Sequence, residues 1–346
     1  MADDGGATPP DARAGRVVAL RALGLGDLLT AVPALRALRG AFPAAELLLA
    51  APAWVAPLLA GKVVDAVVDV DLRAGGGPAP EAIPLPQVLH GADVAVNLHG
   101  AGPQSSRLLA ATGPARLLAH ACTQVPATAG GPPWEPDQHE VHRWARLLEC
   151  YAITCDPGRL DVPVDPALAA PAAAGATLLH PGAAGAARRW PADRWAAVAR
   201  AERAAGRPVV VTAGPGEEPL AAQVATAAGL APGAVLHDLP LPALAATVAA
   251  AGRVAVGDTG VAHLAVAVRT PSVALFGPTS PRRWGPPADR PWHRVLWHGD
   301  PDRPGDPHAA TCDPALLAIT AADVTAALAE LAALAATAPA RGAPPW

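Results

Sequence analysis

The stretch between residues 253 and 284, which reads RVAVGDTGVAHLAVAVRTPSVALFGPTSPRRW, constrains the fold more than any other part of the chain. Its short apolar run 254–256 predicts a buried strand ended by Gly257. Asp258 stands where a helix N-cap is expected, and the helix should run to about Val268. A second strand, 272–276, follows. Two strands joined by one helix form a βαβ unit, so this stretch predicts a parallel sheet of the α/β class.

Small polar loops follow both of these predicted strands. The first carries Asp258, Thr259 and Gly260, and the second reads GPTSP at 277–281 with two arginines beyond it. The carboxyl end of a strand, where a helix begins, presents unpaired backbone N–H groups and the positive end of a helix dipole, which suit a phosphate. The spacing fits an anion-binding crevice, and it fits equally an ordinary βαβ unit whose glycines only make turns.

Length and charge bound the organisation of the chain. Its 346 residues suffice for two α/β domains, and its 33 glycines and 41 prolines fall between apolar runs, as turns and linkers do. A net charge of −4 argues against a nucleic-acid partner, which would need a basic surface. We expect a disordered tail (1–15), a first α/β domain (16–155), a Pro-rich linker (156–175), a second α/β domain (176–314), a closing helix (315–335) and a second tail (336–346).

Signals for membranes, metals and disulfides are weak. The N-terminus carries acids and prolines in place of the basic and apolar regions of a signal peptide, and every apolar run is broken before the roughly eighteen residues of a membrane span. We therefore expect a cytoplasmic protein without a transmembrane segment, and peripheral membrane contact stays open. The four cysteines are expected to be free thiols. His139, His142 and Cys150 match no usual zinc spacing, so no metal site is predicted.

The first predicted domain opens with a buried strand at 16–23, which runs into Gly24-Leu25-Gly26-Asp27. Apolar residues at helical spacing predict a helix that starts near Asp27 and bends at Pro33. The turn is not a dinucleotide fingerprint, because it lacks G-x-G-x-x-G and no acidic residue ends the second strand near Ala50. On these residues alone Asp27 is an N-cap. A helix N-terminus also stabilises an ionised carboxylate, so we expect Asp27 to be a weak base.

A polar cluster follows the strand predicted at 93–98 and should lie at the same sheet edge as Asp27. Four of its residues are candidates for ligand contacts: Asn97, His99, Gln104 and Ser105. Each of them could instead be a turn residue that satisfies its own backbone. The helix predicted at 139–148 is expected to rim the same side, and it is opened by His139, Glu140 and Arg143.

The second predicted domain repeats the pattern of strand, small-residue loop and helix. The strand 177–180 precedes a loop that holds Gly182, Arg188 and Arg189. An arginine among glycines and alanines can approach a diphosphate closely, or it can be a solvent-exposed residue before a helix.

Three further residues of the second predicted domain are candidates for ligand contacts. Glu217, after the strand 208–212, is either a ribose contact or an acid in the first turn of a helix. Leu239, at the end of the strand 235–239, could form an apolar wall for a base together with Leu241. His263 either donates to a phosphate or packs in the core.

Three motifs together resemble the ADP-heptose:lipopolysaccharide heptosyltransferase family of inverting glycosyltransferases. They are DTGVAH at 258–263 with FGPT at 276–279, GDLLTAVPALR at 26–36, and HPGA with RRWP between 180 and 191. The resemblance spans most of the chain and implies the GT-B fold, in which two Rossmann-like domains face one another across a cleft. Asp27 would then be the catalytic base, and the first domain would bind the acceptor through Asn97, His99, Gln104 and Ser105. The second domain would bind the donor through Gly182, Arg188 or Arg189, Glu217, Leu239, Asp258, Thr259, Gly260 and His263.

The function implied by the resemblance is metal-independent, inverting transfer of a heptose-like sugar. The donor would be a nucleotide-diphosphate sugar, ADP-linked as in the family, and the acceptor a hydroxyl of a glycan, a glycolipid or a small molecule, with no resident cofactor. The first domain shows no dense cluster of Lys and Arg, which is in tension with the acidic acceptor of lipopolysaccharide biosynthesis. Two alternatives stay open: a nucleotide-sugar epimerase or hydrolase of the same fold, and a non-catalytic nucleotide-binding module.

Overall fold

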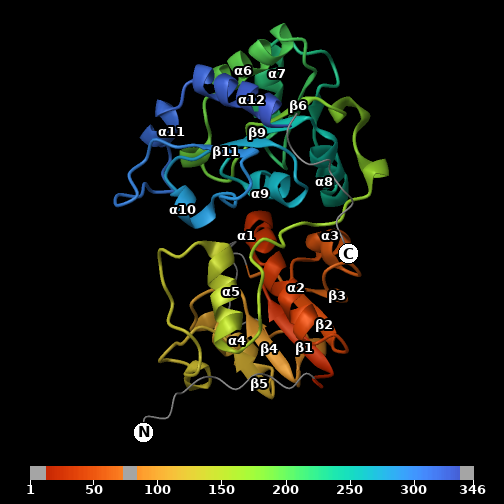
Figure 1. The fold of residues 1–346 in the computed structure, drawn as a ribbon, viewed down its shortest axis with the longest axis vertical. Coiled ribbons are helices and arrows are strands. Elements are labelled where there is room, and N and C mark those ends of the chain that lie inside the picture. Colours follow the sequence, from red (N-terminus) through yellow and green to blue (C-terminus); the bar gives the residue numbers. More distant parts are fainter. Residues whose placement is uncertain (1–12, 73–83, 336–346) are drawn as a thin grey trace. The chain divides into compact units, whose positions relative to one another are not determined.

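The structure is a computed structural model that describes residues 13–72 and 84–335. The chain divides into two compact units, Met1–Val162 and Pro163–Trp346, and each has its own sheet (Figure 1). The division lies inside the segment 156–175, where the sequence predicts a linker. Residues 1–12 of the tail predicted at 1–15, and the whole tail predicted at 336–346, lie outside the described residues. Gly15, also assigned to a disordered tail, instead donates its backbone N–H to the Asp93 carboxylate at 2.8 Å.

The first unit is built on a parallel sheet. Its strands are β1 (Arg16–Leu20), β2 (Glu46–Ala51), β3 (Ala66–Asp69), β4 (Val94–Asn97) and β5 (Arg116–Leu118). They lie in the order β3-β2-β1-β4-β5, and Val18 of β1 pairs with Leu48 on one side and Ala95 on the other. Its α-helices are α1 (Leu25–Thr30), α2 (Val32–Ala41), α3 (Ala56–Leu59), α4 (Gln104–Ala111) and α5 (Glu140–Cys150).

The strand order of this unit has a topological switch point between β1 and β4. From β1 the chain adds strands first on one side of the sheet and then on the other, so the loops after β1 and β4 are neighbours. Ligands of open α/β sheets bind at such a point, beyond the carboxyl ends of the strands. Asp27 and His99 follow these two strands, as the sequence predicted.

The first helical segment differs from its prediction. α1 begins at Leu25 with Gly24 as its N-cap, so Asp27 lies inside the first turn and does not cap the helix. The helix ends at Thr30 with Ala31 as its C-cap, and α2 restarts with Pro33 in its own first turn. A proline in a first turn loses no hydrogen bond, because its N–H would have no partner inside the helix. The break therefore falls two residues before the predicted bend.

The second unit contains a six-stranded parallel sheet. Its strands are β6 (Thr177–His180), β7 (Val209–Thr212), β8 (Val235–Leu236), β9 (Arg253–Gly257), β10 (Ser272–Leu275) and β11 (His293–Leu296), in the order β11-β10-β9-β6-β7-β8. The switch point lies between β6 and β9, so the loops that follow these two strands are neighbours. Its α-helices are α6 (Ala192–Ala204), α7 (Glu218–Ala227), α8 (Leu241–Ala250), α9 (Gly260–Ala267), α10 (Pro281–Trp284), α11 (Pro314–Ala318) and α12 (Ala321–Ala335).

Two elements of this unit are shorter than predicted. β8 ends at Leu236, and Asp238 adopts a left-handed backbone with φ of 54°, which cannot continue a strand. The predicted closing helix is two helices, because Ile319 between α11 and α12 is extended.

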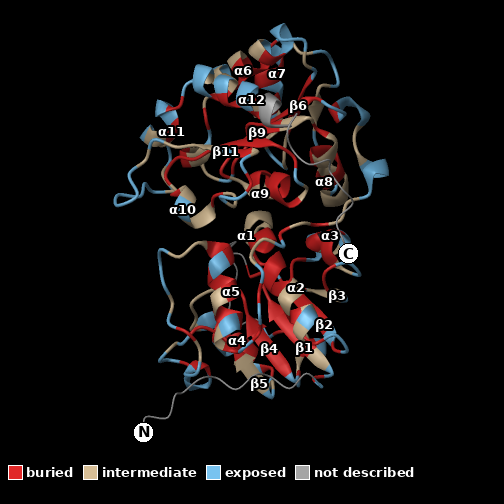
Figure 2. Ribbon diagram, in the orientation of Figure 1, coloured by how far each residue is buried: buried red, intermediate tan, exposed pale blue. Residues whose placement is uncertain are grey.

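The core of the second unit lies between its sheet and the helices α6 and α12 (Figure 2). Trp190 and Trp195 are buried and pack edge to face, with ring centroids 4.9 Å apart. Leu328 of α12 is fully buried in the same cluster as Leu275 of β10. Apart from these two tryptophans, the buried residues of the cluster are Ala, Val, Leu and Ile, which suits helices packed closely on a parallel sheet.

Candidate functional site

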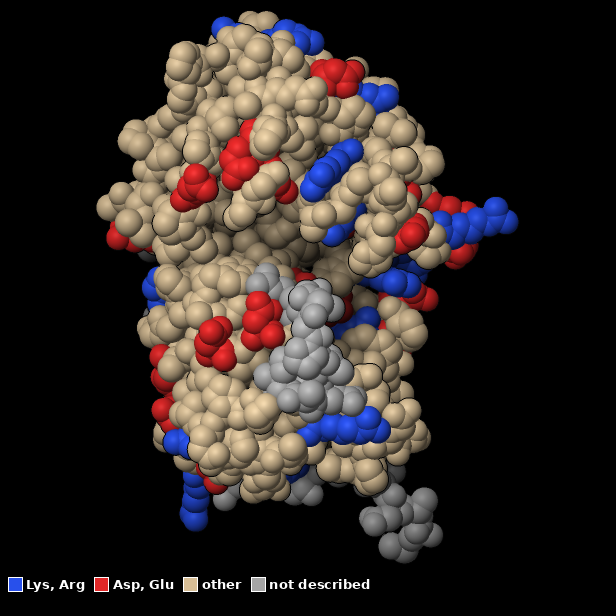
Figure 3. Space-filling view, turned by 180° about the vertical axis from the view of Figure 1, so that it is seen from behind, with Lys and Arg blue, Asp and Glu red and all other residues tan. Residues whose placement is uncertain are grey.

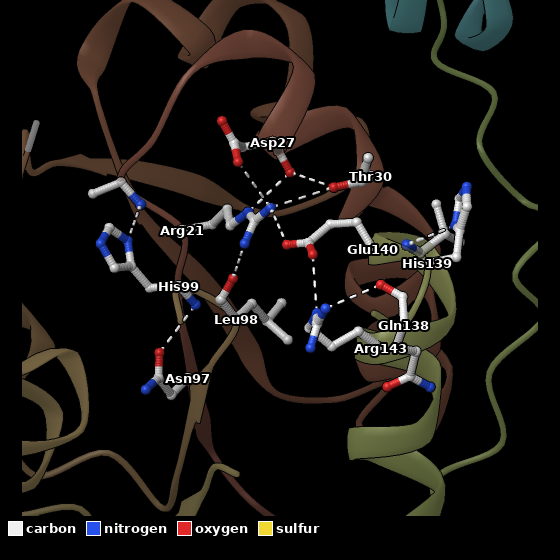
Figure 4. A network of polar contacts seen from close by, with 12 residues as sticks. Arg21, Asp27, Thr30, Asn97, Leu98, His99, Gln138, His139, Glu140 and Arg143 are labelled. Carbon is white, nitrogen blue, oxygen red and sulfur yellow. Dashed lines mark hydrogen bonds and ion pairs between the residues drawn. The ribbon is translucent and has the colours of Figure 1, made fainter. Parts of the chain in front are cut away.

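The candidate site of the first unit is the turn after β1, which carries Asp27 (Figure 4). The backbone carbonyl of Asp27 accepts hydrogen bonds from Arg21 Nε at 2.9 Å and from Thr30 Oγ1 at 2.7 Å. These bonds fix the backbone of the turn, while the Asp27 side chain keeps 33% of its surface exposed. The carboxylate is therefore held in place and open to a substrate.

Arg21 is a buried cation at the centre of the site in the first unit, and its side chain is 1% exposed. Besides the Asp27 carbonyl, it donates to the Leu98 carbonyl at 2.6 Å and to Glu140 Oε1 at 2.9 Å. Its contact with Asp27 Oδ1 is longer, at 3.4 Å. The guanidinium also lies over the ring of Trp144, 4.8 Å from the ring centroid. A buried guanidinium needs this many acceptors, because it carries five N–H donors and cannot lose its charge.

Burial raises the pKa of the Asp27 carboxyl above its ordinary value; Arg21 opposes this rise and Glu140 adds to it. Backbone hydrogen bonds at Gly24 and Asp27 itself also act to lower the pKa, but they do not reverse the direction. The prediction that a helix N-terminus makes Asp27 a weak base is therefore wrong in sign. Desolvation of the carboxylate outweighs the helix terminus, and a raised pKa makes a stronger base.

The four predicted ligand residues lie between the end of β4 and the start of α4: Asn97 ends the strand, His99 is in the loop, and Gln104 and Ser105 open the helix. Asn97 is buried and donates to the hydroxyls of Ser105 at 3.0 Å and Ser106 at 2.9 Å, and its Oδ1 accepts from the backbone N–H of His99 at 3.0 Å. Asn97 and Ser105 thus fix the shape of this loop. Gln104 is exposed at the start of α4.

His99, on the same loop, binds the backbone that follows β1. Its Nδ1 accepts from the backbone N–H of Ala22 at 3.2 Å. Burial, reinforced by the positive charge of Arg21, lowers the pKa of His99 to about 4. The imidazole is therefore neutral at physiological pH, and its other nitrogen, Nε2, carries the proton and can donate it to a hydrogen bond.

Sequence reasoning missed the most buried charged side chains of the site in the first unit. Glu140 was expected only to rim the site, yet it binds Arg21 and accepts from Arg143 Nε at 3.0 Å. Arg143 in turn donates to the carbonyls of Glu135 at 2.6 Å and Gln138 at 3.0 Å and lies 3.8 Å from the ring centroid of Trp134. One signal was available: Glu140 and Arg143 are three residues apart, the spacing of an ion pair on one helix face.

The candidate site of the second unit lies where β6 and β9 end. Arg188 is on the loop after β6, and its Nη1 donates to the backbone carbonyl of Asp258 at 3.3 Å. Within the described part of the chain, Arg188 Nε and Thr259 Oγ1 are both buried and have no hydrogen-bond partner. Buried polar atoms without a partner are costly, so two of them beside a helix N-terminus fit an anion that would bind there.

The start of α9 differs from its prediction in one residue. Thr259 is the N-cap residue, with no side-chain hydrogen bond to the helix, and Gly260 is the first helical residue. Asp258, predicted to be the cap, is buried, and its backbone N–H donates to Leu275 at 3.0 Å as an extension of the sheet. No side chain caps the first turn of α9, which leaves it to a ligand.

Glu217 lies just before α7 and not in its first turn. Its Oε2 accepts from the Gly214 backbone N–H at 2.9 Å and lies 3.6 Å from His180 Nε2. Burial lowers the pKa of His180, although Glu217 opposes this. A Cβ on Gly182 would come within 2.0 Å of Glu217 Oε2. Only glycine at position 182 leaves room for this carboxylate.

The remaining donor candidates lie around this edge of the sheet. Arg189 donates through Nε to the Ala183 carbonyl at 2.8 Å and is more exposed, so Arg188 is the better placed of the two arginines. His263 packs its ring edge to face on Trp284, with centroids 6.0 Å apart. Leu239 is half-buried beyond the end of β8.

On the face shown in Figure 3, the basic and acidic side chains are interspersed in small groups. Among residues 13–72 and 84–335, no three His, Cys, Asp or Glu residues are grouped as metal ligands. None of the helices in the same ranges is long and apolar enough to cross a membrane.

Comparison with known proteins finds one family for part of the chain: the family model of glycosyltransferase family 9 (heptosyltransferase) matches residues 133–298. No curated protein sequence matches the chain significantly.

Three solved structures have the same fold. A glycosyl transferase family 9 protein from Veillonella parvula has a TM-score of 0.72 at 19% identity, over 92% of this chain and 97% of that one. The E. coli ADP-heptose lps heptosyltransferase II gives 0.69 at 19% identity, over 93% and 100%. The E. coli heptosyltransferase WaaC, solved with ADP, gives 0.66 at 18% identity, over 91% and 99%. At these identities the likeness establishes the fold, which is GT-B, and the family match supports the resemblance found in the motifs at 180–191 and 258–279.

Proposed function

We propose that this chain, a glycosyltransferase of the family 9 (heptosyltransferase) type, transfers a heptose-like sugar from an ADP-linked donor to an acceptor hydroxyl with inversion at the anomeric carbon. In this reaction the acceptor oxygen attacks the anomeric carbon, the bond from that carbon to the phosphate oxygen breaks, and ADP leaves with the electron pair. The acceptor proton passes to Asp27. A single displacement of this kind inverts the configuration.

The observation that carries the proposal is the pair of unpartnered buried atoms, Arg188 Nε and Thr259 Oγ1, at the uncapped start of α9. A diphosphate would give both atoms a partner and would meet the backbone N–H groups of the first helical turn. The guanidinium would also stabilise the charge that develops on the leaving group. An anion site of this build is what a nucleotide-diphosphate donor needs.

The remaining donor contacts follow from the same sheet edge. Glu217 would accept hydrogen bonds from ribose hydroxyls, Leu239 would lie against the base, and Asp258 and His263 would meet the sugar and the phosphate. Adenine is proposed because the E. coli heptosyltransferase WaaC was solved with ADP. The acceptor, a glycan, a glycolipid or a small molecule, would be bound by the loop after β4, with His99 Nε2 as a neutral donor. We propose no resident metal, so transfer should persist in EDTA.

Titration of the purified protein with ADP, UDP, GDP and their sugar conjugates tests the donor site. We expect ADP to bind selectively and Arg188→Ala to weaken it by roughly tenfold or more, since a charge-assisted hydrogen bond is lost. Arg189→Ala is the matched control and should have a smaller effect. Selective binding of UDP or GDP would contradict the adenine assignment, and equal effects of the two variants would contradict the choice of Arg188.

Transfer itself is tested with Asp27→Asn. Removal of a general base should slow transfer by roughly 10²–10⁴-fold while ADP affinity stays near that of the wild type. A variant that keeps most of its transfer rate would exclude Asp27 as the base. Consumption of the donor at full rate without any acceptor would instead indicate a hydrolase or an epimerase.

A further inference from the structure

Four charged side chains meet below the Asp27 turn: Arg21, Asp27, Glu140 and Arg143 (Figure 4). They come from three places in the chain, namely the end of β1, the first turn of α1 and the first turns of α5. Two are cations and two are anions, so the group is balanced as a whole. Which anion Arg21 binds most closely decides how strongly its positive charge acts on the Asp27 carboxylate.

The distances show that Glu140 is the main counter-ion of Arg21. Arg21 Nη2 lies 2.9 Å from Glu140 Oε1 but 3.4 Å from Asp27 Oδ1. Charge-assisted hydrogen bonds between guanidinium and carboxylate are about 2.7–2.9 Å long, so only the first is a full bond. What Arg21 gives Asp27 is its Nε bond to the backbone carbonyl. Arg21 thus holds the Asp27 backbone more tightly than it holds the Asp27 carboxylate.

Glu140 cannot easily turn away from Arg21. Its other oxygen, Oε2, is bound by Arg143 Nε at 3.0 Å, and the Glu140 side chain is only 10% exposed. Arg143 is itself fixed by the carbonyls of Glu135 and Gln138 and by the ring of Trp134. On the opposite side, Trp144 supports the guanidinium of Arg21. The arrangement is therefore rigid on both sides of the Arg21–Glu140 bond.

We infer that Glu140 is a positioning residue for the base: by binding Arg21 it keeps that cation as a clamp on the Asp27 backbone and away from the Asp27 carboxylate. The catalytic consequence of this inference rests on the proposed function, whereas its effect on Asp27 ionisation does not. If Glu140 lost its charge, the nearest anion for Arg21 would be Asp27. The 3.4 Å contact would then become a full ion pair, and Asp27 would be a weaker base.

The other titratable groups near Asp27 do not replace Glu140. His99, on the loop after β4, is neutral because burial and Arg21 lower its pKa to about 4. His139, at the N-cap of α5, accepts the backbone N–H of Val141 through Nδ1 and contacts the ring of His142. Arg143 faces Glu140 and not Asp27. Glu140 is therefore the anion to change.

The test compares Glu140→Gln with Glu149→Gln, an exposed glutamate on the same helix. The carboxyl carbon of Asp27 is titrated by NMR in each protein without substrate, and its signal is assigned by its loss in Asp27→Asn. We expect the pKa of Asp27 to fall in Glu140→Gln and to stay unchanged in Glu149→Gln. A folded Glu140→Gln protein with an unchanged or higher Asp27 pKa would overturn the inference.

A second variant covers the case in which Glu140→Gln does not fold. Glu140→Asp keeps the charge but withdraws it from Arg21 by one methylene, so a smaller fall in the Asp27 pKa is expected.

In a transfer assay, the acid limb of the kcat profile should move to lower pH in Glu140→Gln, and kcat on the plateau should fall roughly tenfold. The KM for the donor should change little, and Glu140→Asp should restore part of the rate. A loss of rate with no movement of the acid limb would indicate a purely structural role and contradict the inference.

These readouts separate the two proposals. If the Asp27 pKa moves as expected but even the wild-type protein transfers no sugar, the proposed function fails and the role of Glu140 stands. If the wild type transfers sugar and Asp27→Asn does not, while the Asp27 pKa is the same in Glu140→Gln, the function stands and the role of Glu140 fails.

Discussion

At the residue scale, the Asp27 carboxylate works against folding at neutral pH. Burial raises its pKa in the folded chain, so the folded state binds this proton more tightly than the unfolded state does. The stability associated with this group is complete below the unfolded pKa and is lost as pH rises through the folded pKa. A poised base at an active site commonly has this cost.

Asp27→Asn should therefore be more stable than the wild type at neutral pH. We expect a Tm higher by a few degrees at pH 7, with the difference shrinking as the pH is lowered towards the ordinary pKa of an aspartate. Thermal unfolding at a series of pH values measures this.

Asp93 provides a control of opposite sign. Hydrogen bonds from the backbone N–H groups of Arg16 and Gly15 lower its pKa, so its contribution is present above the unfolded pKa and is lost as the pH falls. Asp93→Asn should lower the Tm at neutral pH. A Tm for Asp27→Asn at or below that of the wild type at pH 7 would show that its burial costs nothing.

Single residues differ in how far the sequence predicts them. Asp27 and Arg188 were found because they stand in motifs, at strand ends where ligands bind. The bond between Arg21 and Glu140 joins residues 119 positions apart, and no periodicity or spacing links them. The N-cap of α9 was predicted one residue too early, at Asp258, because the backbone N–H of Asp258 extends the sheet. The preference of aspartate for capping positions does not reveal that pairing.

At the scale of elements, α12 is part of the core of the second unit. The described part of α12 packs on α6 and on the sheet of the second unit, with Val324, Leu328 and Leu331 in the core. The apolar side chains cover strands that would otherwise be exposed on that face.

Leu328→Ala should therefore destabilise the second unit strongly. Leu328 is fully buried, and truncating such a leucine costs about 2–5 kcal/mol. Leu317 on α11 is 39% exposed, so Leu317→Ala should cost less than about 0.5 kcal/mol. Urea titration read by amide hydrogen exchange, with peptides from each unit followed separately, measures both. Similar costs for the two variants would show that α12 is not part of the core.

Elements were predicted well where a short apolar run ends in Gly or Pro, as in the strands before Asp27 and before Gly182. Their boundaries were less certain, because they depend on backbone conformation. Asp238, just beyond β8, has a left-handed backbone conformation. An aspartate tolerates this conformation, but its presence in a sequence does not predict it. The break at Ala31 likewise depends on which residue starts α2, and Pro33 fits any position in a first turn.

At the scale of the whole molecule, both units place their polar loops at the switch point of their sheets. In the first unit these loops follow β1 and β4, and in the second they follow β6 and β9. The alternation of strands and helices in the sequence predicted two α/β domains, but it does not specify strand order. The order was implied only by the family resemblance, and the pairing of β6 with β9 brings Arg188 beside Thr259.

Each unit also has a core of its own, which leads to a prediction about the chain in parts. All the residues proposed to bind the donor lie in the second unit, as do the helices and strands that position them. A fragment of residues 163–346 should therefore fold and bind ADP with an affinity within a few fold of that of the full chain. It should not transfer sugar, because Asp27 is missing, and a fragment of residues 1–162 should not bind ADP. Circular dichroism, thermal unfolding and calorimetric titration of both fragments measure these properties. A 163–346 fragment that unfolds cooperatively but does not bind ADP, while the full chain does, would mean that the first unit supplies part of the donor site.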